Sequence, residues 1–266
     1  MSVLLSGLAL SAIIAVAAYR LGSLSASGVL GAVLVGTLTL SLGGWAWGTV
    51  LIAFFVSSSL LSRYGEERKR ALAEKFAKGG RRDLAQVLAN GGLAALLAVL
   101  HAFQPGFMWW VAFLGSLAAV SADTWATELG VLSPGPPRLI TTGQRVARGT
   151  SGGVSTLGMI ATLAGGAFIA LLGAVAPESA GRAGLVFLSA WVAGIAGSLL
   201  DSGLGATVQA MYYCAEEGVE TERVIHTCGR ATQFRRGWRW LNNEGVNLIS
   251  SLSGTLIALA LLGVLV

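Results

Sequence analysis

The strongest constraint on the fold is a series of eight apolar segments, each close to the length of a membrane span. About 20 mostly apolar residues are needed for a helix to cross the hydrocarbon core of a bilayer. The segments cover residues 3–19, 27–42, 45–61, 84–103, 107–132, 152–175, 184–211 and 246–266. We therefore predict an all-α fold: a polytopic transmembrane helical bundle with about eight spans (range seven to nine), forming one transmembrane domain over residues 1–266.

The composition excludes other classes of protein. Charged residues make up 12% of the 266 residues, about half of the ~25% typical of soluble domains. This excludes an ordinary soluble enzyme and a disordered chain, and two cysteines are too few for a disulfide framework. The second and third segments meet at Gly43–Gly44 and form either a tight hairpin or one broken element. Met1–Ser2 lacks the basic region of a signal peptide, so we expect residue 1 to be the true start.

The orientation follows from the basic residues. Loops 62–83, 133–150 and 212–243 hold sixteen of the 18 lysines and arginines, and two spans separate each loop from the next. The positive-inside rule makes these basic loops cytoplasmic and places both the N and C termini outside. Four tryptophans near the opposite span ends are expected to form an interfacial aromatic belt: Trp45, Trp47, Trp109 and Trp110.

Three acidic residues lie within the predicted spans: Asp123, Glu128 and Asp201. At 1.5 Å per residue they lie roughly 14, 6 and 15 Å from the cytoplasmic ends of their spans. Ionisable residues at such depths are costly and usually functional. A hard divalent cation such as Mg²⁺ would offset the repulsion between them. The alternative is that they are protonated or hydrogen-bonded groups that join helices.

Polar and small residues accompany these carboxylates. Ser116, Ala119, Asp123, Thr127 and Gly130 share one face of the fifth span, and an equivalent stripe in the seventh includes Ser198 and Asp201. Stripes of this kind also serve helix packing alone. Side-chain amides enter from the basic-loop side at Gln86 and Asn90 in the fourth span and at Asn242, Asn243 and Asn247 in the eighth. Such amides either line a polar cavity or join neighbouring helices.

A glycine-rich run precedes the sixth span, from Arg145 to Ser155. Its glycines allow backbone N–H groups to approach an anion, and a helix N-terminus favours negative charge. Arg145, Arg148 and the hydroxyls beside them add to a phosphate cradle, although the Gly-Lys-Ser/Thr of a Walker A loop is absent. Packing alone is the competing explanation for the glycines.

Two further features have weaker chemical signals. Cys214, His226 and Cys228 resemble part of a zinc site, but a fourth ligand is missing. We expect these three to have a purely structural role, with thiols kept reduced on the cytoplasmic side. The charge run 62–83 is expected to be an amphipathic segment on anionic lipid, or else a cap over the site.

Six segments together resemble one known family, the integral-membrane family that contains the phytyl-phosphate kinase of tocopherol synthesis. These segments are 80–91, 121–130 with its Ala-Asp-Thr-Trp-Ala-Thr-Glu-Leu-Gly, 137–142, 149–155, 197–209 and 243–247. The first 60 residues match this family only as apolar spans. The plant enzyme's chloroplast targeting segment is absent, which fits a prokaryotic source and a plasma or thylakoid membrane.

The resemblance implies a transferase: a kinase that moves the γ-phosphate of a nucleoside triphosphate, CTP rather than ATP, to an isoprenoid monophosphate such as phytyl phosphate. Asp123, Glu128 and Asp201 would be the catalytic residues and would hold Mg²⁺, with Mn²⁺ as a substitute. The phosphate- and nucleotide-binding set would be Arg138, Arg145, Arg148, Gly149, Thr150, Ser151, Gly152, Gly153 and Ser155. The substrate-orienting set would be Gln86, Asn90, Thr124, Thr127, Ser198, Gln209, Asn243 and Asn247.

Two rival functions use similar residues. A cytidylyltransferase acting on CTP and a lipid phosphate needs nearly the same site but attacks the α-phosphate. An ion-coupled transporter also buries acidic residues at glycine-interrupted helices, but it should show matching inverted halves, which this sequence lacks. We expect the nucleotide, the isoprenoid monophosphate and membrane lipid to be the partners, with no nucleic acid. The sequence leaves the oligomeric state open.

Overall fold

The computed structural model describes residues 2–70 and 80–265. Within them, eight helices are long and apolar enough to cross a membrane, as predicted. They are α1 (Ser2–Arg20), α2 (Ala26–Leu38) continued by the π-helical turn η1 (Thr39–Gly43), α3 (Trp45–Arg63), α5 (Leu84–Phe103), α6 (Phe107–Gly130), α7 (Thr156–Val175), α8 (Ala183–Thr207) and α9 (Asn243–Leu265). The short helices are α4 (Glu66–Arg70) and the 3-10 turn η2 (Pro177–Ser179).

Span boundaries differ from the prediction where polar caps and strands begin. The span predicted at 152–175 begins at Thr156, because Ser155 caps α7: its hydroxyl accepts a hydrogen bond from the Gly158 N–H at 3.1 Å. The span predicted to end at 211 ends at Thr207. The chain then leaves the helix direction and enters a strand.

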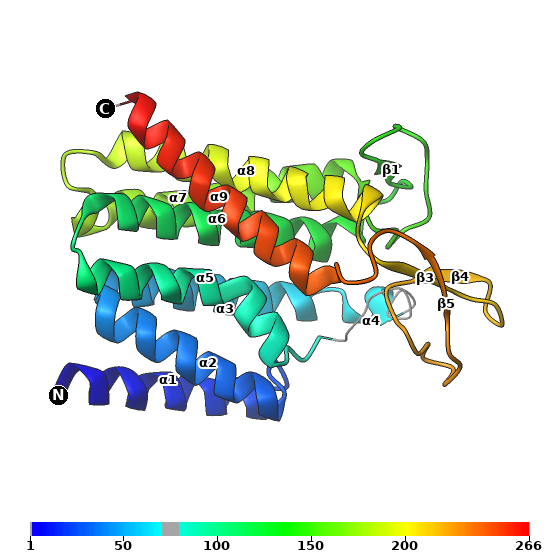
Figure 1. Ribbon diagram of the computed structural model, residues 1–266, viewed down its shortest axis with the longest axis horizontal. Helices are drawn as coiled ribbons and strands as arrows, with labels where there is room; N and C mark the ends of the chain where they lie inside the picture. The colour runs from blue at the N-terminus through cyan, green and yellow to red at the C-terminus, as the bar shows by residue number, and fades with distance from the viewer. Residues whose placement is uncertain (1, 71–79, 266) are drawn as a thin grey trace.

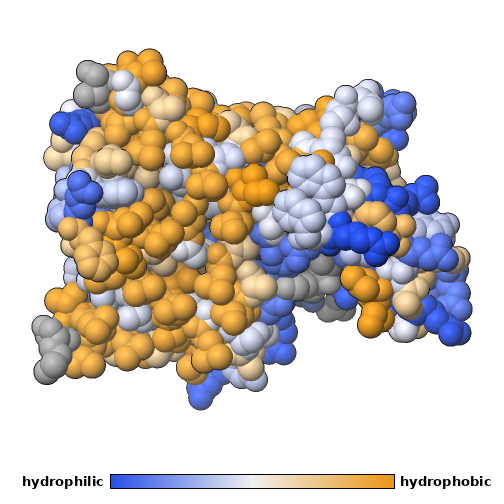
Figure 2. All heavy atoms as spheres, in the orientation of Figure 1, coloured by the Kyte–Doolittle hydropathy of each residue, from blue (hydrophilic) through white to orange (hydrophobic). Residues whose placement is uncertain are grey.

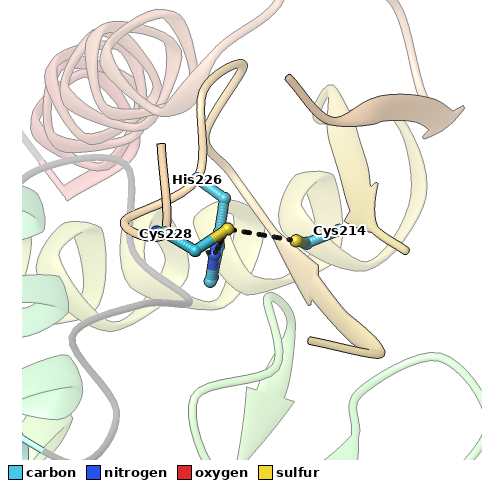
Figure 3. A group of neighbouring side chains, drawn as sticks. All are labelled: Cys214, His226 and Cys228. Atoms are coloured by element: carbon cyan, nitrogen blue, oxygen red, sulfur yellow. Dashed lines mark hydrogen bonds between the residues drawn. The ribbon is translucent and has the colours of Figure 1, made fainter. Parts of the chain in front are cut away.

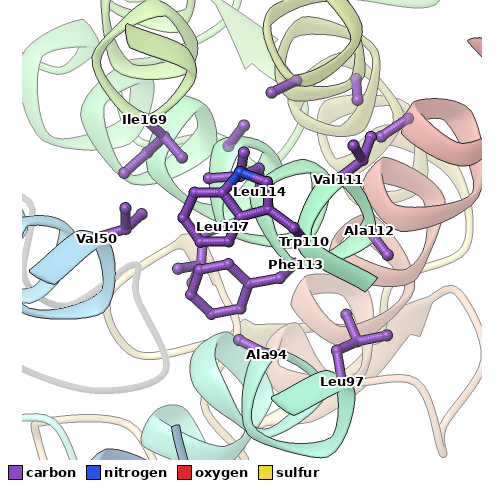
Figure 4. Packing of buried hydrophobic residues seen from close by; sticks show 14 of the residues in the cluster. Val50, Ala94, Leu97, Trp110, Val111, Ala112, Phe113, Leu114, Leu117 and Ile169 are labelled. Atoms are coloured by element: carbon purple, nitrogen blue, oxygen red, sulfur yellow. The ribbon is translucent and has the colours of Figure 1, made fainter. Parts of the chain in front are cut away.

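Helix α6 is the centre of the bundle. It packs against α3, α5, α7, α8 and α9, and every residue from Trp110 to Ala122 is buried. Because α6 is enclosed on all sides, its apolar residues show no helical stripe. Figure 4 shows large side chains of α6 packed among Val50 of α3, Ala94 and Leu97 of α5, and Ile169 of α7.

The predicted aromatic belt is half wrong. Trp47 and Trp110 are each 1% exposed and lie in the core, with ring centroids 4.5 and 5.6 Å from that of Phe113. The Trp110 indole N–H donates to Ser179 Oγ at 2.9 Å, which satisfies its polar edge inside the protein. Trp45 is 72% exposed, as an interfacial residue should be.

Small residues let α6 approach its neighbours closely. A Cβ at Gly115 would lie 2.5 Å from the Gly254 carbonyl oxygen of α9, so the two backbones are in contact there. One turn further along the same face of α6, a Cβ at Gly197 of α8 would lie 2.5 Å from the Cβ of Ala119. Packing therefore accounts for Ala119 and Gly197, and it fixes the rotation of α8 and α9 about α6.

The second and third spans form a tight hairpin. The π-helical turn η1 ends at Gly43, and Gly44 has a φ of +96°, a left-handed conformation that favours glycine. The Gly44 N–H donates to the Leu40 carbonyl at 3.2 Å, and its own carbonyl accepts from the Gly48 N–H at 3.0 Å. The chain thus reverses direction without a loop.

The described parts of the three basic loops lie at one end of the bundle, and the two ends of the chain lie at the other (Figure 1). The loops contain short strands that the sequence did not predict. A two-stranded antiparallel sheet joins β1 (Arg138–Leu139) to β2 (Gly153–Val154). A three-stranded antiparallel sheet of order β4-β3-β5 contains β3 (Met211–Cys214), β4 (Val219–Thr221) and β5 (Gln233–Arg236). The fold is otherwise helical.

The surface separates into an apolar body and a polar end. Figure 2 shows hydrophobic residues over the helices and hydrophilic residues gathered where the loops lie. Exposed leucines on the helices include Leu30, Leu96 and Leu256, which are 51–69% accessible. Such a surface is costly in water and stable in a bilayer, as expected for an integral membrane protein.

Candidate active site

A cavity of about 710 Å³ opens at the basic-loop end. Its walls come from α3, α5, α6 and α8, from the starts of α7 and α9, and from the loops between them. All of the predicted site residues except Arg138 and Arg145 line it. The lining set is Gln86, Asn90, Asp123, Thr124, Thr127, Glu128, Arg148, Gly149, Thr150, Ser151, Gly152, Gly153, Ser155, Ser198, Asp201, Gln209, Asn243 and Asn247.

Asp123 and Asp201 are brought together by the contact between α6 and α8. Gly197 of α8 packs on Ala119 of α6, and both helices run toward the basic-loop end (Figure 1). One turn further along, residues four positions on share the same faces, and these residues are Asp123 and Asp201. Their carboxylates repel each other and that of Glu222. The close packing therefore creates a concentrated negative charge in the cavity wall.

Glu128 differs from the other two predicted carboxylates. Lys69 Nζ lies 2.6 Å from Glu128 Oε2, and the Ser62 hydroxyl donates to Oε1 at 2.5 Å. Side-chain exposures of 14% for Lys69 and 22% for Glu128 mark a largely shielded ion pair. Glu128 is therefore already neutralised by a cation, whereas Asp123 and Asp201 have an acidic neighbour instead.

That neighbour, Glu222, is a residue that sequence reasoning missed. It follows β4 in a loop otherwise identified only by its basic residues, and it lines the cavity. Gln209 Nε2 donates to Glu222 Oε1 at 2.8 Å, and Gln209 Oε1 accepts from the Ser151 hydroxyl at 3.1 Å. Both ends of the buried Gln209 amide are thus bonded to protein, and they connect the glycine loop to the strands.

The glycine-rich loop 149–155 bends around the end of α8. Gly149 and Gly152 have φ values of +76° and +78°, and a Cβ at Gly152 would lie 2.5 Å from the Cβ of Ala206. Packing thus accounts for Gly152. The loop nevertheless presents the start of α7 to the cavity, as a phosphate cradle requires.

Four basic side chains of the charged segment 62–83 also line the cavity: Arg63 at the end of α3, Lys69 of α4, and Arg81 and Arg82 before α5. Sequence reasoning placed them only in a charged segment that lies on lipid or caps the site. The backbone N–H of Arg82 donates to the Ser23 carbonyl at 3.0 Å, which fixes residues 80–82 beside the α1–α2 turn. Burial lowers the pKa of Arg82, and the carboxylate of Glu128 acts in the opposite direction.

Residues 71–79 of the charge run, with Lys75 and Lys78, lie outside the described residues. Arg138 and Arg145 lie on the exposed β1 turn, where their backbones form an isolated antiparallel β-bridge. Arg138 Nη1 donates to the Gly143 carbonyl at 2.9 Å. The structure therefore does not bring these two predicted phosphate ligands to the cavity, because the turn that carries them points away from it.

The cavity has oxygen atoms that suit a cation. Neither Asp201 Oδ2 nor Asn90 Oδ1, both buried, has a hydrogen-bond partner within residues 2–70 and 80–265. Unpaired buried oxygens of this kind cost free energy, and carboxylate and amide oxygens are the ligands that Mg²⁺ prefers. Mg²⁺ is usually held by one or two carboxylates together with water and substrate phosphates. The residues present therefore fit such an ion.

Comparison with known proteins decides the family. A family model described as "Integral membrane protein DUF92" matches residues 9–255. The chain belongs to this family. The family resemblance predicted from the sequence motifs is thereby confirmed, and the DUF92 match includes the first spans, which showed no motif.

Relatives of this DUF92 protein include proteins of a plant, an archaeon and a cyanobacterium. It is 34% identical to Protein PGR of Arabidopsis thaliana, over 91% of this chain and 90% of the relative. It is 32% identical to an uncharacterized membrane protein of Methanocaldococcus jannaschii, over 86% and 82%. It is 26% identical to Protein VTE6, chloroplastic, of Arabidopsis thaliana, over 89% and 64%. No solved structure matches.

Proposed function

We propose that this DUF92 protein is a membrane kinase that transfers the γ-phosphate of a nucleoside triphosphate to an isoprenoid monophosphate such as phytyl phosphate. One observation carries the proposal: a single cavity combines paired aspartates, arginines and a glycine loop, and shares residues with an apolar crevice. The family resemblance supports the same reaction. The cavity would face the cytoplasm of a prokaryotic plasma or thylakoid membrane.

The charges of the cavity suit phosphoryl transfer. This reaction needs cationic neutralisation, a cradle for phosphates and alignment of the two reactants, with little covalent chemistry by the protein. Arg82 and Arg148 supply fixed positive charge at the wall, and the start of α7 supplies backbone N–H groups. Asp123 and Asp201 would hold Mg²⁺, which when bound neutralises charge on the phosphates.

The apolar crevice suits an isoprenoid chain. It lies among α1, α2, α3 and α5, with a wall that is almost wholly apolar. Arg82, Gln86 and Asn90 line both this crevice and the cavity. A lipid whose tail occupied the crevice would therefore present its phosphate beside the arginine and the cation-binding oxygens.

The proposed step needs no strong general base. An oxygen of the acceptor monophosphate attacks the γ-phosphorus, and the bond between that phosphorus and the β–γ bridging oxygen breaks. A nucleoside diphosphate leaves and an isoprenoid diphosphate forms. The acceptor is already an anion, so the side chains have to position and screen charge rather than remove a proton.

The test uses purified protein in detergent with Mg²⁺, phytyl or geranylgeranyl monophosphate, and each of CTP, ATP, UTP and GTP. Products are resolved by mass spectrometry. Asp123→Asn and Asp201→Asn are run beside Glu178→Gln, a control that removes an exposed carboxylate from η2 at the opposite end. We expect a prenyl diphosphate and a nucleoside diphosphate, with CTP the best donor. We expect turnover to be lost in both aspartate variants and kept in the control.

Other products would assign other functions. A nucleotidyl-lipid with pyrophosphate would identify the cytidylyltransferase, since that enzyme attacks the α-phosphate in nearly the same site. No turnover of any lipid phosphate by folded protein would overturn the kinase. Ion-coupled transport would then be assayed in liposomes.

A further inference from the structure

The segment between α8 and α9 holds a second group of chemically active side chains, which differ in chemistry from the carboxylates of the cavity. Cys214, His226 and Cys228 each offer one ligand atom, and these atoms all lie within 4.8 Å of one another. No other trio of histidine, cysteine, aspartate or glutamate residues meets this criterion in the part of the chain that the structure describes. Figure 3 shows the three side chains turned toward a common point.

Two tight turns bring these residues together. Cys214 ends β3, and its carbonyl accepts from the N–H of Gly218 at 2.9 Å. His226 and Cys228 lie on the turn between β4 and β5, where the His226 carbonyl accepts from the N–H of Gly229 at 2.9 Å. Gly218 and Gly229 have φ values of +66° and +83°. Left-handed glycines thus close the turn that follows Cys214 and the turn that carries His226 and Cys228.

The histidine has the surroundings of a ligand rather than of an ordinary core residue. It is 3% exposed, and its Nε2 is buried without a hydrogen-bond partner among the described residues. Nδ1 lies 3.2 Å from Cys228 Sγ and 3.4 Å from the Cys228 backbone N. A buried imidazole normally has two polar partners. Here the polar groups within reach belong mainly to the cysteine cluster.

We propose that Cys214, His226 and Cys228 bind a zinc ion. Thiolate sulfur and imidazole nitrogen are the ligands that Zn²⁺ prefers, whereas Mg²⁺ and Ca²⁺ take oxygen. Cys214 Sγ and Cys228 Sγ are 3.8 Å apart and both cysteines are free, a separation that two sulfurs on one tetrahedral ion reach. Cys228 is exposed, so a water can occupy the fourth position. This replaces the expectation of a purely structural role for the three residues.

The ion would secure the wall of the carboxylate cavity. Arg236 of β5 donates to the carbonyls of Gly205 and Ala206 at the end of α8, at 3.2 and 3.0 Å. Glu222 follows β4 and lines the cavity. A zinc ion joining the end of β3 to the β4–β5 turn would therefore hold these contacts in place. This inference does not depend on the proposed kinase reaction.

The experiment measures metal directly. The full chain, carrying a tag without histidine, is purified in detergent under reducing conditions with Zn²⁺ in the growth medium, and zinc is counted by elemental mass spectrometry. We expect about one zinc ion per chain in the wild type. We expect loss of most of it in Cys214→Ser, His226→Asn and Cys228→Ser. Glu216→Gln is the matched control, because it removes an exposed partner of Arg230 on the same turns and should keep its zinc.

A second readout keeps the test decisive if a variant folds poorly. Wild-type protein is stripped with a chelator and reloaded with Co²⁺, which should give sulfur-to-cobalt charge-transfer absorption. Chelation should also increase proteolytic cleavage within 212–243. The proposal is overturned by wild-type protein without zinc and without the cobalt spectrum. Zinc unchanged in all three ligand variants, or a Cys214–Cys228 disulfide in reduced preparations, would overturn it as well.

Discussion

At the scale of single residues, the charge balance of the cavity depends on Glu222 rather than on Glu128. The charge of Glu222 acts on both Asp123 and Asp201, whereas Glu128 forms an ion pair with Lys69 at 2.6 Å. Removing a negative charge that acts directly on the groups that hold a cation weakens cation binding. The two glutamates therefore form a matched pair for testing where Mg²⁺ binds.

We predict that Glu222→Gln raises the Mg²⁺ concentration needed for half-maximal turnover by about tenfold, or about 1.4 kcal/mol of binding free energy. Glu128→Gln should change it by less than about threefold. The measurement is a Mg²⁺ titration of turnover, repeated as a titration of thermal stabilisation by Mg²⁺ without substrate. A larger effect of Glu128→Gln in both titrations would restore the ligand set predicted from the sequence.

Sequence reasoning found Asp123 and Asp201 but not Glu222, and the reason is physical. A carboxylate in an apolar span stands out because its burial is costly, and helix periodicity then gives its face and depth. Glu222 lies in a polar loop where acidic residues are common. Only the β4-β3-β5 pairing carries it to the cavity. Arg138 and Arg145 were assigned to the site because they are close in sequence to the glycine loop. That closeness did not determine where their turn points.

At the scale of elements, the contact between α6 and α9 allows a sharp comparison within one helix. Gly254 packs on the backbone of Gly115, whereas Gly263 has no atom within 4 Å of its would-be Cβ. We predict that Gly254→Ala destabilises the protein by about 1–3 kcal/mol, as other overpacked cores do. Gly263→Ala should be neutral or slightly stabilising. Apparent melting temperatures in detergent measure both, and equal melting temperatures would contradict the close contact.

The sequence largely predicted which helices exist, but it did not predict what surrounds each of them. Apolar length alone placed the eight spans, because the bilayer sets that length. It did not distinguish the enclosed α6 from lipid-facing helices, so Trp47 and Trp110 were assigned to an interface instead of the core. The strands of 212–243 were missed because they are short and lack a regular alternation of polar and apolar residues.

At the scale of the whole molecule, the fold predicts an orientation. Both termini lie at one end and the basic loops at the other (Figure 1). Locating one of these ends relative to the membrane therefore also locates the other. We predict that a C-terminal alkaline phosphatase fusion is active in a bacterial host and that a C-terminal green fluorescent protein is dark. Green fluorescent protein inserted at Gly143, in the exposed turn after β1, should fluoresce. The opposite pattern would place the cavity outside the cell.

The connection between cavity and crevice leads to the last prediction. Ala32 of α2 lines the crevice, and Ala26 of the same helix is exposed outside it. Ala32→Phe should fill the space proposed for the isoprenoid tail and raise the KM for geranylgeranyl monophosphate by about tenfold. A five-carbon monophosphate should be much less affected, because its tail ends before the added ring. Ala26→Phe should change neither KM by more than about twofold.

Steady-state kinetics with the two chain lengths separates this effect from damage to the fold. Misfolding lowers kcat for both acceptors together, whereas a filled crevice changes the ratio of their KM values. An unchanged ratio in folded Ala32→Phe protein would place the tail elsewhere, against the exposed faces of the helices. The proposed head-group site would then require only that a lipid phosphate reach the cavity from the bilayer surface, with Arg81 and Arg63 at the wall as its first charged contacts.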